Sequence, residues 1–261
     1  MSEIAANVQA VHQRIRAAAQ RAGRNGAEIT LVAVTKTHPL ETVIAAYQAG
    51  LRHFGENRAI EGQEKAIGLK KWLQSAPKTD TSVSSDLKVG SELPTWHLIG
   101  HVQHRQVADM LGYFQWVHSV DSLKLVQRIH RLAERDNCPP VEILLQCNVS
   151  GEATKSGFEL DRWSSDKKQL TAFLEVITHM ISFNKVKIRG LMTMAPFFSD
   201  PENARPTFQS LAALKESLKV EIPQADWTHL SMGMTDDFEV AIEEGATIIR
   251  VGRALFGERN Y

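Results

Sequence analysis

Short apolar runs alternate with longer stretches of helical spacing along almost the whole chain, and this alternation limits the possible folds more than any other feature. Eight runs are typical of buried strands: 31–35, 53–55, 96–99, 116–118, 142–148, 187–192, 227–230 and 247–251. Helices are predicted between them, near 39–49, 57–72, 103–111, 122–136, 161–180, 202–219 and 235–244. Strands that alternate with helices pair in parallel through right-handed crossovers. The sequence therefore predicts an α/β fold.

The number of strands and the chain length favour a (β/α)8 TIM barrel over an open, doubly wound sheet. The chain has 261 residues, which suits a single barrel domain over 1–261. The first strand is not followed by the Gly-x-Gly-x-x-Gly pattern of dinucleotide-binding sheets. Residues 3–22 have the apolar spacing of an extra amino-terminal helix that packs on the barrel. The polar segment at about 75–94 is predicted to be a surface insertion.

Composition and charge exclude several classes of partner. The 30 basic residues equal the 30 acidic ones, so no overall field attracts nucleic acid or an anionic membrane. No stretch reaches the roughly 18 apolar residues of a membrane span. Cys138 and Cys147 lack the spacing of metal ligands, which indicates reduced thiols and a cytoplasmic protein.

Three segments are expected to meet at the carboxyl-terminal mouth of such a barrel, where active sites of this fold lie. Lys36 ends the first strand, 231–235 follow the seventh, and 250–253 end the eighth. A lysine against apolar walls has a lowered pKa, and its neutral amine can form a Schiff base. Small residues before a helix suit a phosphate, and Gly252 permits close approach of the backbone.

Each of these segments also has a purely structural explanation. A lysine can simply end a strand in water, a serine or threonine can cap a helix, and a glycine can make a turn. Taken separately, the structural explanations are favoured. Taken together across one barrel mouth, the three segments favour a ligand site slightly.

Seven motifs occur in a fixed order between about residues 30 and 257. They are VAVTKT (32–37), HFGENR (53–58), WHLIGHVQ (96–103), NVSGEATKSGF (148–158), GLMTMAP (190–196), LSMGMTDDF (230–238) and IRVGRALFG (249–257). This series resembles the pyridoxal phosphate homeostasis protein family, whose fold is similar to the amino-terminal barrel of alanine racemase. The resemblance covers nearly the whole chain.

The resemblance implies a cofactor and a set of residues that hold it. It implies pyridoxal 5′-phosphate (PLP) bound as an internal aldimine on Lys36, with Arg250 facing the pyridine nitrogen. The other residues that it implies are Ser231, Gly252 and Arg253 at the phosphate, and Asn57 and Met192, with Met194, around the ring. Asn57 as a helix cap and the methionines as core filling are the structural alternatives.

The function implied by the resemblance is intracellular PLP homeostasis, in which PLP is held reversibly by a monomer and is available to PLP-dependent apo-enzymes. An arginine opposite the pyridine nitrogen opposes its protonation and makes the cofactor a weaker electron sink, which suits a carrier better than an enzyme. An amino-acid racemase is the first alternative, but it needs a second base, and the tyrosines Tyr47, Tyr113 and Tyr261 lie in no matching motif. A lysine aldolase without PLP, acting on a phosphosugar, is the second alternative.

The sequence departs from the family at one motif. The family commonly has Leu-Gln-Ser-Asn-Lys where this chain has Val-Gln-His-Arg-Gln at 102–106. A role for a basic side chain at position 106 is therefore in doubt. Lys155, in the loop after the fifth strand, is a candidate for assisting amine exchange, although a solvated loop lysine is the favoured interpretation.

Overall fold

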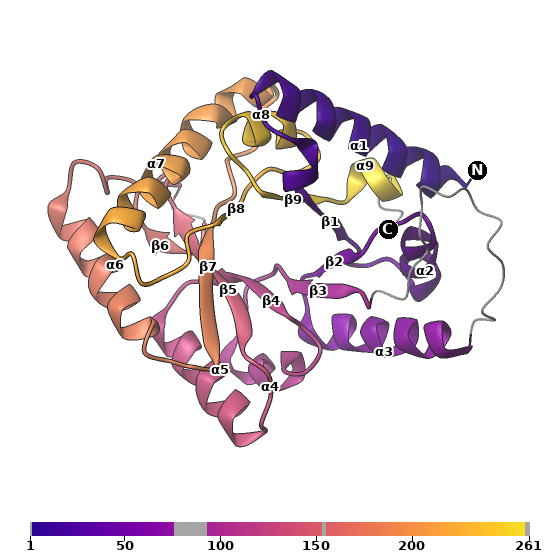
Figure 1. Ribbon diagram of the computed structural model, residues 1–261, viewed down its shortest axis with the longest axis horizontal. Coiled ribbons are helices and arrows are strands. Elements are labelled where there is room, and N and C mark those ends of the chain that lie inside the picture. Colours follow the sequence, from indigo (N-terminus) through magenta and orange to yellow (C-terminus); the bar gives the residue numbers. More distant parts are fainter. Residues whose placement is uncertain (1, 76–92, 153–154, 259–261) are drawn as a thin grey trace.

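Eight parallel strands close into a barrel, which confirms the predicted (β/α)8 fold (Figure 1). The computed structural model describes residues 2–75, 93–152 and 155–258. The barrel strands are β1 (Thr30–Val34), β2 (His53–Glu56), β3 (Thr95–Leu98), β4 (Trp116–Val120), β5 (Val141–Asn148), β7 (Val186–Met192), β8 (His229–Ser231) and β9 (Ile248–Val251). Each pairs with the next in this order, and β9 closes the sheet on β1. A short strand that was not predicted, β6 (Phe158–Glu159), pairs with the end of β5.

Helices surround the strands on the outside of the barrel (Figure 1). They are α1 (Glu3–Arg21), α2 (Leu40–Gln48), α3 (Ala59–Ser75), α4 (Val107–Met110), α5 (Leu123–Arg135), α6 (Lys167–Met180), α7 (Arg205–Glu221), α8 (Phe238–Glu243) and α9 (Arg253–Phe256). Short 3-10 turns occur at η1 (Gly26–Glu28), η2 (His104–Gln106) and η3 (Pro201–Ala204).

Several boundaries differ from the predicted ranges, and two of them have a clear local reason. The helix predicted near 161–180 begins at Lys167, because the Asp166 carboxylate caps it by accepting backbone N–H groups of the first turn. The seventh barrel strand begins at His229, after the predicted start, because Trp227 lies in the core and donates its indole N–H to the Ile222 carbonyl.

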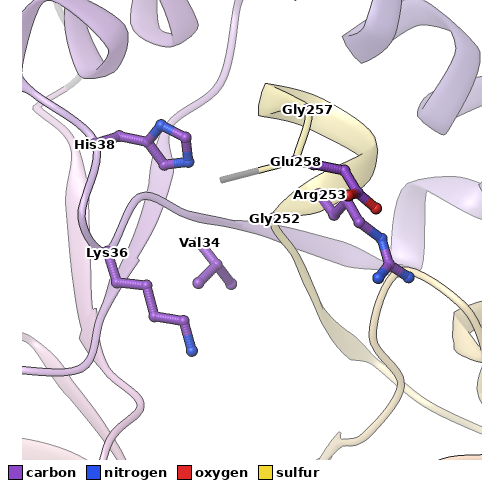
Figure 2. Close-up of a pocket in the computed structure, with 7 residues that line it drawn as sticks. All are labelled: Val34, Lys36, His38, Gly252, Arg253, Gly257 and Glu258. Carbon is purple, nitrogen blue, oxygen red and sulfur yellow. The ribbon is translucent and has the colours of Figure 1, made fainter. Parts of the chain in front are cut away.

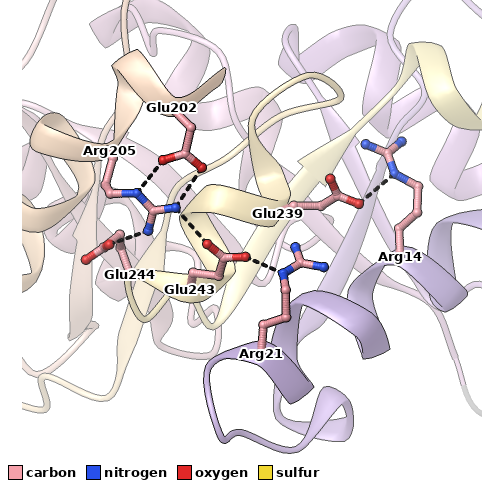
Figure 3. A network of polar contacts seen from close by, with 7 residues as sticks. All are labelled: Arg14, Arg21, Glu202, Arg205, Glu239, Glu243 and Glu244. Atoms are coloured by element: carbon pink, nitrogen blue, oxygen red, sulfur yellow. Dashed lines mark hydrogen bonds and ion pairs between the residues drawn. The ribbon is translucent and has the colours of Figure 1, made fainter. Parts of the chain in front are cut away.

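The extra amino-terminal helix, α1, packs against α8 and α9. Its buried face consists of Val8, Val11, Ile15, Ala18 and Ala19. Polar contacts flank this face, as Figure 3 shows: Arg14 pairs with Glu239 at 3.0 Å, and Arg21 pairs with Glu243 at 2.7 Å. Arg205 of α7 binds Glu243 as well. Exposed ion pairs contribute about 0–1 kcal/mol each, so the apolar face supplies most of the attachment.

The interior of the barrel combines a small apolar cluster with polar side chains. The apolar members are Val32, Leu144, Met192 and Ile248. Buried polar side chains on the strands include those of His97, His118, Ser231 and Arg250. A barrel interior filled with Val, Ile and Leu is the more common arrangement. The polar side chains therefore point to a function for the barrel interior.

Two sequence features concern the limits of the described chain. Most of the predicted polar insertion, 76–92, lies outside the described residues. Within the described ranges, no helix has both the length and the apolar character needed to cross a bilayer.

Candidate functional site

A cavity of about 270 Å³ lies where β1 and β9 end. Its lining residues are Val34, Lys36, His38, Gly252, Arg253, Gly257 and Glu258. Lys36 and His38 lie on one side of this cavity, and Arg253 and Glu258 lie on the other (Figure 2). Its volume is near the lower end of the roughly 300–1,000 Å³ that is common for small-molecule sites. The structure thus brings Lys36 together with Gly252 and Arg253.

The turn that carries Lys36 is fixed on both sides by a buried ionic cluster. The Lys65 ammonium donates to the carbonyl of Thr35 at 2.7 Å and to Glu56 Oε1 at 2.8 Å. The Thr35 hydroxyl also donates to Glu56 Oε1, at 2.6 Å. On the other side of Lys36, Glu61 accepts the backbone N–H of Thr37 at 2.7 Å. The residues on both sides of Lys36 are therefore fixed: Thr35 by α3 and β2, and Thr37 by α3.

The backbone of this turn is strained. Thr37 has a φ of 66°, which a β-branched residue rarely adopts. Such strain persists only where surrounding contacts impose it, and it clusters at functional sites. Glu56 is also held at a cost, because burial raises the pKa of its carboxyl group and its Oε2 has no hydrogen-bond partner among the described residues. This cluster was not predicted from the sequence, although Glu56 at the end of a buried strand is a visible signal for it.

The two glycines of the neighbouring turns differ in what requires them. Gly233, after β8, has a φ of 91°, and a Cβ there would lie 2.6 Å from the Ala241 Cβ. Gly252, after β9, has a φ of −119°, and a Cβ there would lie 3.4 Å from Val34, an ordinary contact. The fold therefore needs glycine at 233 but not at 252. A side chain at 252 would instead reach toward Val34, which lines the cavity. The cavity, rather than the fold, therefore explains why glycine stands at this position.

The cavity also contains the charge that an anion requires. Arg253 begins α9, where the first backbone N–H groups of a helix lack intrahelical partners. Its guanidinium is half-exposed and pairs with Asp236. The Asp236 carboxylate holds the pKa of Arg253 above its usual value, so the residue stays cationic. Lys36 and Arg253 therefore place one basic side chain on each side of the cavity, and the Glu258 carboxylate lies on the same side as Arg253.

Ser231 and Arg250 lie inside the barrel and contact each other rather than the cavity. Arg250 donates Nη1 to the Ser231 hydroxyl at 2.5 Å and to the Ser231 carbonyl at 3.0 Å, and Nη2 to the Thr193 carbonyl at 3.0 Å. Burial lowers the pKa of Arg250 to about 10, which leaves it charged at neutral pH. Its two terminal nitrogens are thus held by Ser231, the last residue of β8, and by Thr193, which follows β7.

The remaining predicted residues lie around this region. Met192 is buried in the apolar cluster of the interior, and Asn57 is half-buried in the turn after β2. Lys155 differs from the solvated lysine that was expected. Its ammonium donates to the Met194 carbonyl at 2.8 Å and pairs with Glu152 at 3.0 Å, so it holds its loop against the end of β7.

The chain is similar to known proteins over nearly its whole length. Residues 6–260 match the family model described as "Alanine racemase, N-terminal domain". The pyridoxal phosphate homeostasis protein of Pseudomonas aeruginosa is 38% identical over 261 residues, which cover 100% of this chain and 98% of the relative. The solved structure of PipY from Synechococcus elongatus with PLP bound is 30% identical, with a TM-score of 0.73 over 98% of this chain and 100% of that chain.

A more distant structure shares only the fold. Alanine racemase of Clostridium difficile 630 is 11% identical, with a TM-score of 0.64, and the match covers 98% of this chain and 57% of that chain. The expected likeness to the amino-terminal barrel of alanine racemase is confirmed at the level of architecture.

Proposed function

Because this chain belongs to the family of pyridoxal phosphate homeostasis proteins, we propose that it binds PLP reversibly and controls the availability of the free cofactor. The observation that supports this most strongly is the shared cavity of Lys36, Gly252 and Arg253. A primary amine, an open backbone position and a guanidinium are what an aldehyde that carries a phosphate requires.

Each residue of the site has a proposed role. The Lys36 amine and the PLP aldehyde form a Schiff base with loss of one water, and water or another amine reverses the bond. The backbone of Gly252 and Arg253 holds the phosphate, and Ser231 contributes its hydroxyl. Arg250 faces the pyridine nitrogen, while Met192 and Asn57 line the ring. The Glu56–Lys65 cluster keeps the Lys36 turn in place.

A carrier explains the interior better than a racemase does. Arg250 is fixed by Ser231 and Thr193 and remains charged, so it opposes protonation of a pyridine nitrogen placed against it. A racemase needs a second base on the opposite face of the ring. Within the described part of the chain, Tyr47 is buried against Trp72 and Tyr113 packs on the main core, and neither lines the cavity with Lys36.

The setting of this activity is proposed on more general grounds. We place it in the cytoplasm, in a monomer that forms one PLP-binding domain over residues 1–261 and supplies PLP-dependent apo-enzymes. The balanced charge supports a partner other than nucleic acid or a membrane surface. Cys138 and Cys147 are free thiols, which suits a reducing compartment.

Visible absorption spectroscopy tests the proposal. The purified protein with PLP added should show the absorption band of a Schiff base, and Lys36→Ala should abolish it. Lys70→Ala, which removes an exposed lysine of α3, is the matched control and should leave the band unchanged. A band of equal strength in Lys36→Ala would reject the assigned residue. Rapid exchange of the α-deuterium of amino acids would favour the racemase instead.

A further inference from the structure

Three histidines form an unbroken hydrogen-bonded chain through the barrel interior and end on Ser231. His53 Nδ1 lies 3.0 Å from His97 Nε2, and His97 Nδ1 lies 2.9 Å from His118 Nε2. His118 Nδ1 lies 2.9 Å from the Ser231 hydroxyl oxygen, which also accepts from Arg250 at 2.5 Å. Every link therefore has hydrogen-bond length.

The hydrogen-bonded series runs across the barrel interior from β2 to β8. His53 is in register with Val32 of β1, which is in register with Arg250 of β9, the residue that contacts Ser231. His97, His118 and Ser231 are at most 1% exposed, whereas His53 is only half-buried. Among the three histidines, water therefore reaches the imidazole of His53 but not those of His97 and His118.

The two middle imidazoles are neutral, and this limits the chain to two arrangements. Burial, together with the neighbouring charges, holds the pKa of His97 and of His118 well below the usual value. A neutral imidazole has one donor nitrogen and one acceptor nitrogen. The hydrogen bonds must therefore all run in the same direction, either from Ser231 toward His53 or from His53 toward Ser231.

The direction decides what the Ser231 hydroxyl does. In the first arrangement, its proton is donated to His118 Nδ1. In the second, His118 Nδ1–H donates to the hydroxyl oxygen, whose other lone pair already accepts from Arg250. Both lone pairs are then occupied, and the hydroxyl proton must go to a third acceptor.

We propose that His118 and His97 are positioning residues that direct the Ser231 hydroxyl toward an anionic ligand, and that protonation of His53 selects this arrangement. The proposal rests on the PLP-binding function above, because it takes the phosphate as the third acceptor. A protonated His53 has N–H on both nitrogens and must donate to His97. The extra proton stays on His53, while His97 and His118 change from the Nε2–H to the Nδ1–H tautomer.

Coupling of this kind is reciprocal. A phosphate that accepts from Ser231 favours the second arrangement and so favours protonation of His53, and protonation of His53 strengthens phosphate binding.

The groups that face the three histidines from neighbouring elements are mostly basic: Arg250 of β9, His229 of β8, Arg189 of β7 with its partners Glu142 and Asp226, and Lys215 of α7. β1 contributes Val32 beside His53, and β3 contributes Thr95.

The first test observes the tautomers directly. In protein labelled with nitrogen-15 on histidine, the ring-nitrogen shifts report which nitrogen carries the proton. Addition of PLP at neutral pH should convert His97 and His118 to the Nδ1–H form, and acidification without PLP should do the same. Unchanged shifts at both residues under both conditions would overturn the proposal.

The second test measures PLP affinity against pH in the wild type and in His53→Gln. Glutamine retains a donor and an acceptor at this half-buried position but does not titrate. Because burial lowers the pKa of His53, the gain is expected at a pH below the ordinary histidine value of about 6.5. There the affinity of the wild type should gain about fivefold or more on that of the variant. The ratio cancels the titration of PLP itself. A constant ratio would overturn the histidine proposal alone, whereas absence of PLP binding to the wild type would reject the proposed function.

Discussion

Replacement of Gly252 by alanine separates binding from folding at the candidate phosphate turn. The added Cβ would lie 3.4 Å from the nearest atoms of Val34, and the φ of −119° is one that other residues adopt. We therefore expect Gly252→Ala to change the free energy of unfolding by less than about 1 kcal/mol. The methyl group would reach into the cavity and hold a phosphate away from the backbone. Loss of one hydrogen bond to a charged group costs about 1.5–3 kcal/mol, or roughly ten- to hundredfold in the dissociation constant of PLP.

The assay combines urea unfolding with a PLP titration followed by absorbance. Gly233→Ala is the matched control, because its Cβ would lie 2.6 Å from the Ala241 Cβ at a φ of 91°, and it should lower stability. Wild-type PLP affinity in a stably folded Gly252→Ala would refute the assignment of the phosphate to this turn. A large loss of stability would refute the argument that only the ligand requires this glycine.

Two further predictions concern the buried groups. Lys65→Met should lower the free energy of unfolding by about 3–5 kcal/mol, because it leaves the Glu56 carboxylate buried without the Lys65 ammonium. In urea unfolding, the double variant with Glu56→Met should recover part of this loss. Since His97 and His118 stay neutral in the folded state but gain protons on unfolding, stability should fall as pH falls below about 6.5. Between about pH 7.5 and 5.5 these two residues contribute a loss of about 2–3 kcal/mol, and the variant with glutamine at both positions should show a correspondingly shallower slope.

Outcomes against these two predictions are distinct. Wild-type stability in Lys65→Met would mean that the ionic cluster is not needed to hold the Lys36 turn. An unchanged pH slope in the double glutamine variant would mean that the two imidazoles already carry protons in the folded protein.

The barrel was predictable because its signals are local. Each apolar run marks a strand, and the alternation with helices sets parallel pairing. Sites of this fold lie at the carboxyl ends of the strands, and this alone places Lys36 near Gly252 and Arg253 without knowledge of any side-chain contact. These residues do line one cavity. Their roles as ligands of PLP stay predictions.

The polar interior was not predictable in the same way. Whether His118 meets Ser231 depends on the stagger of β4 and β8 across the barrel, and no local pattern encodes that stagger. The contact between Lys65 and Thr35 likewise joins a helix to a strand end 30 positions away. Trp227 shows the same limit at a boundary, because its position in the core overrides its strand-like neighbourhood.

Mass spectrometry of the protein after incubation with PLP and reduction with borohydride tests the central claim most directly. Reduction converts a Schiff base into a stable secondary amine, so that the peptide that carries the adduct can be sequenced. The account predicts one reduced pyridoxyl phosphate group per chain, on Lys36. An adduct spread over exposed lysines, with Lys36 unmodified, would contradict it.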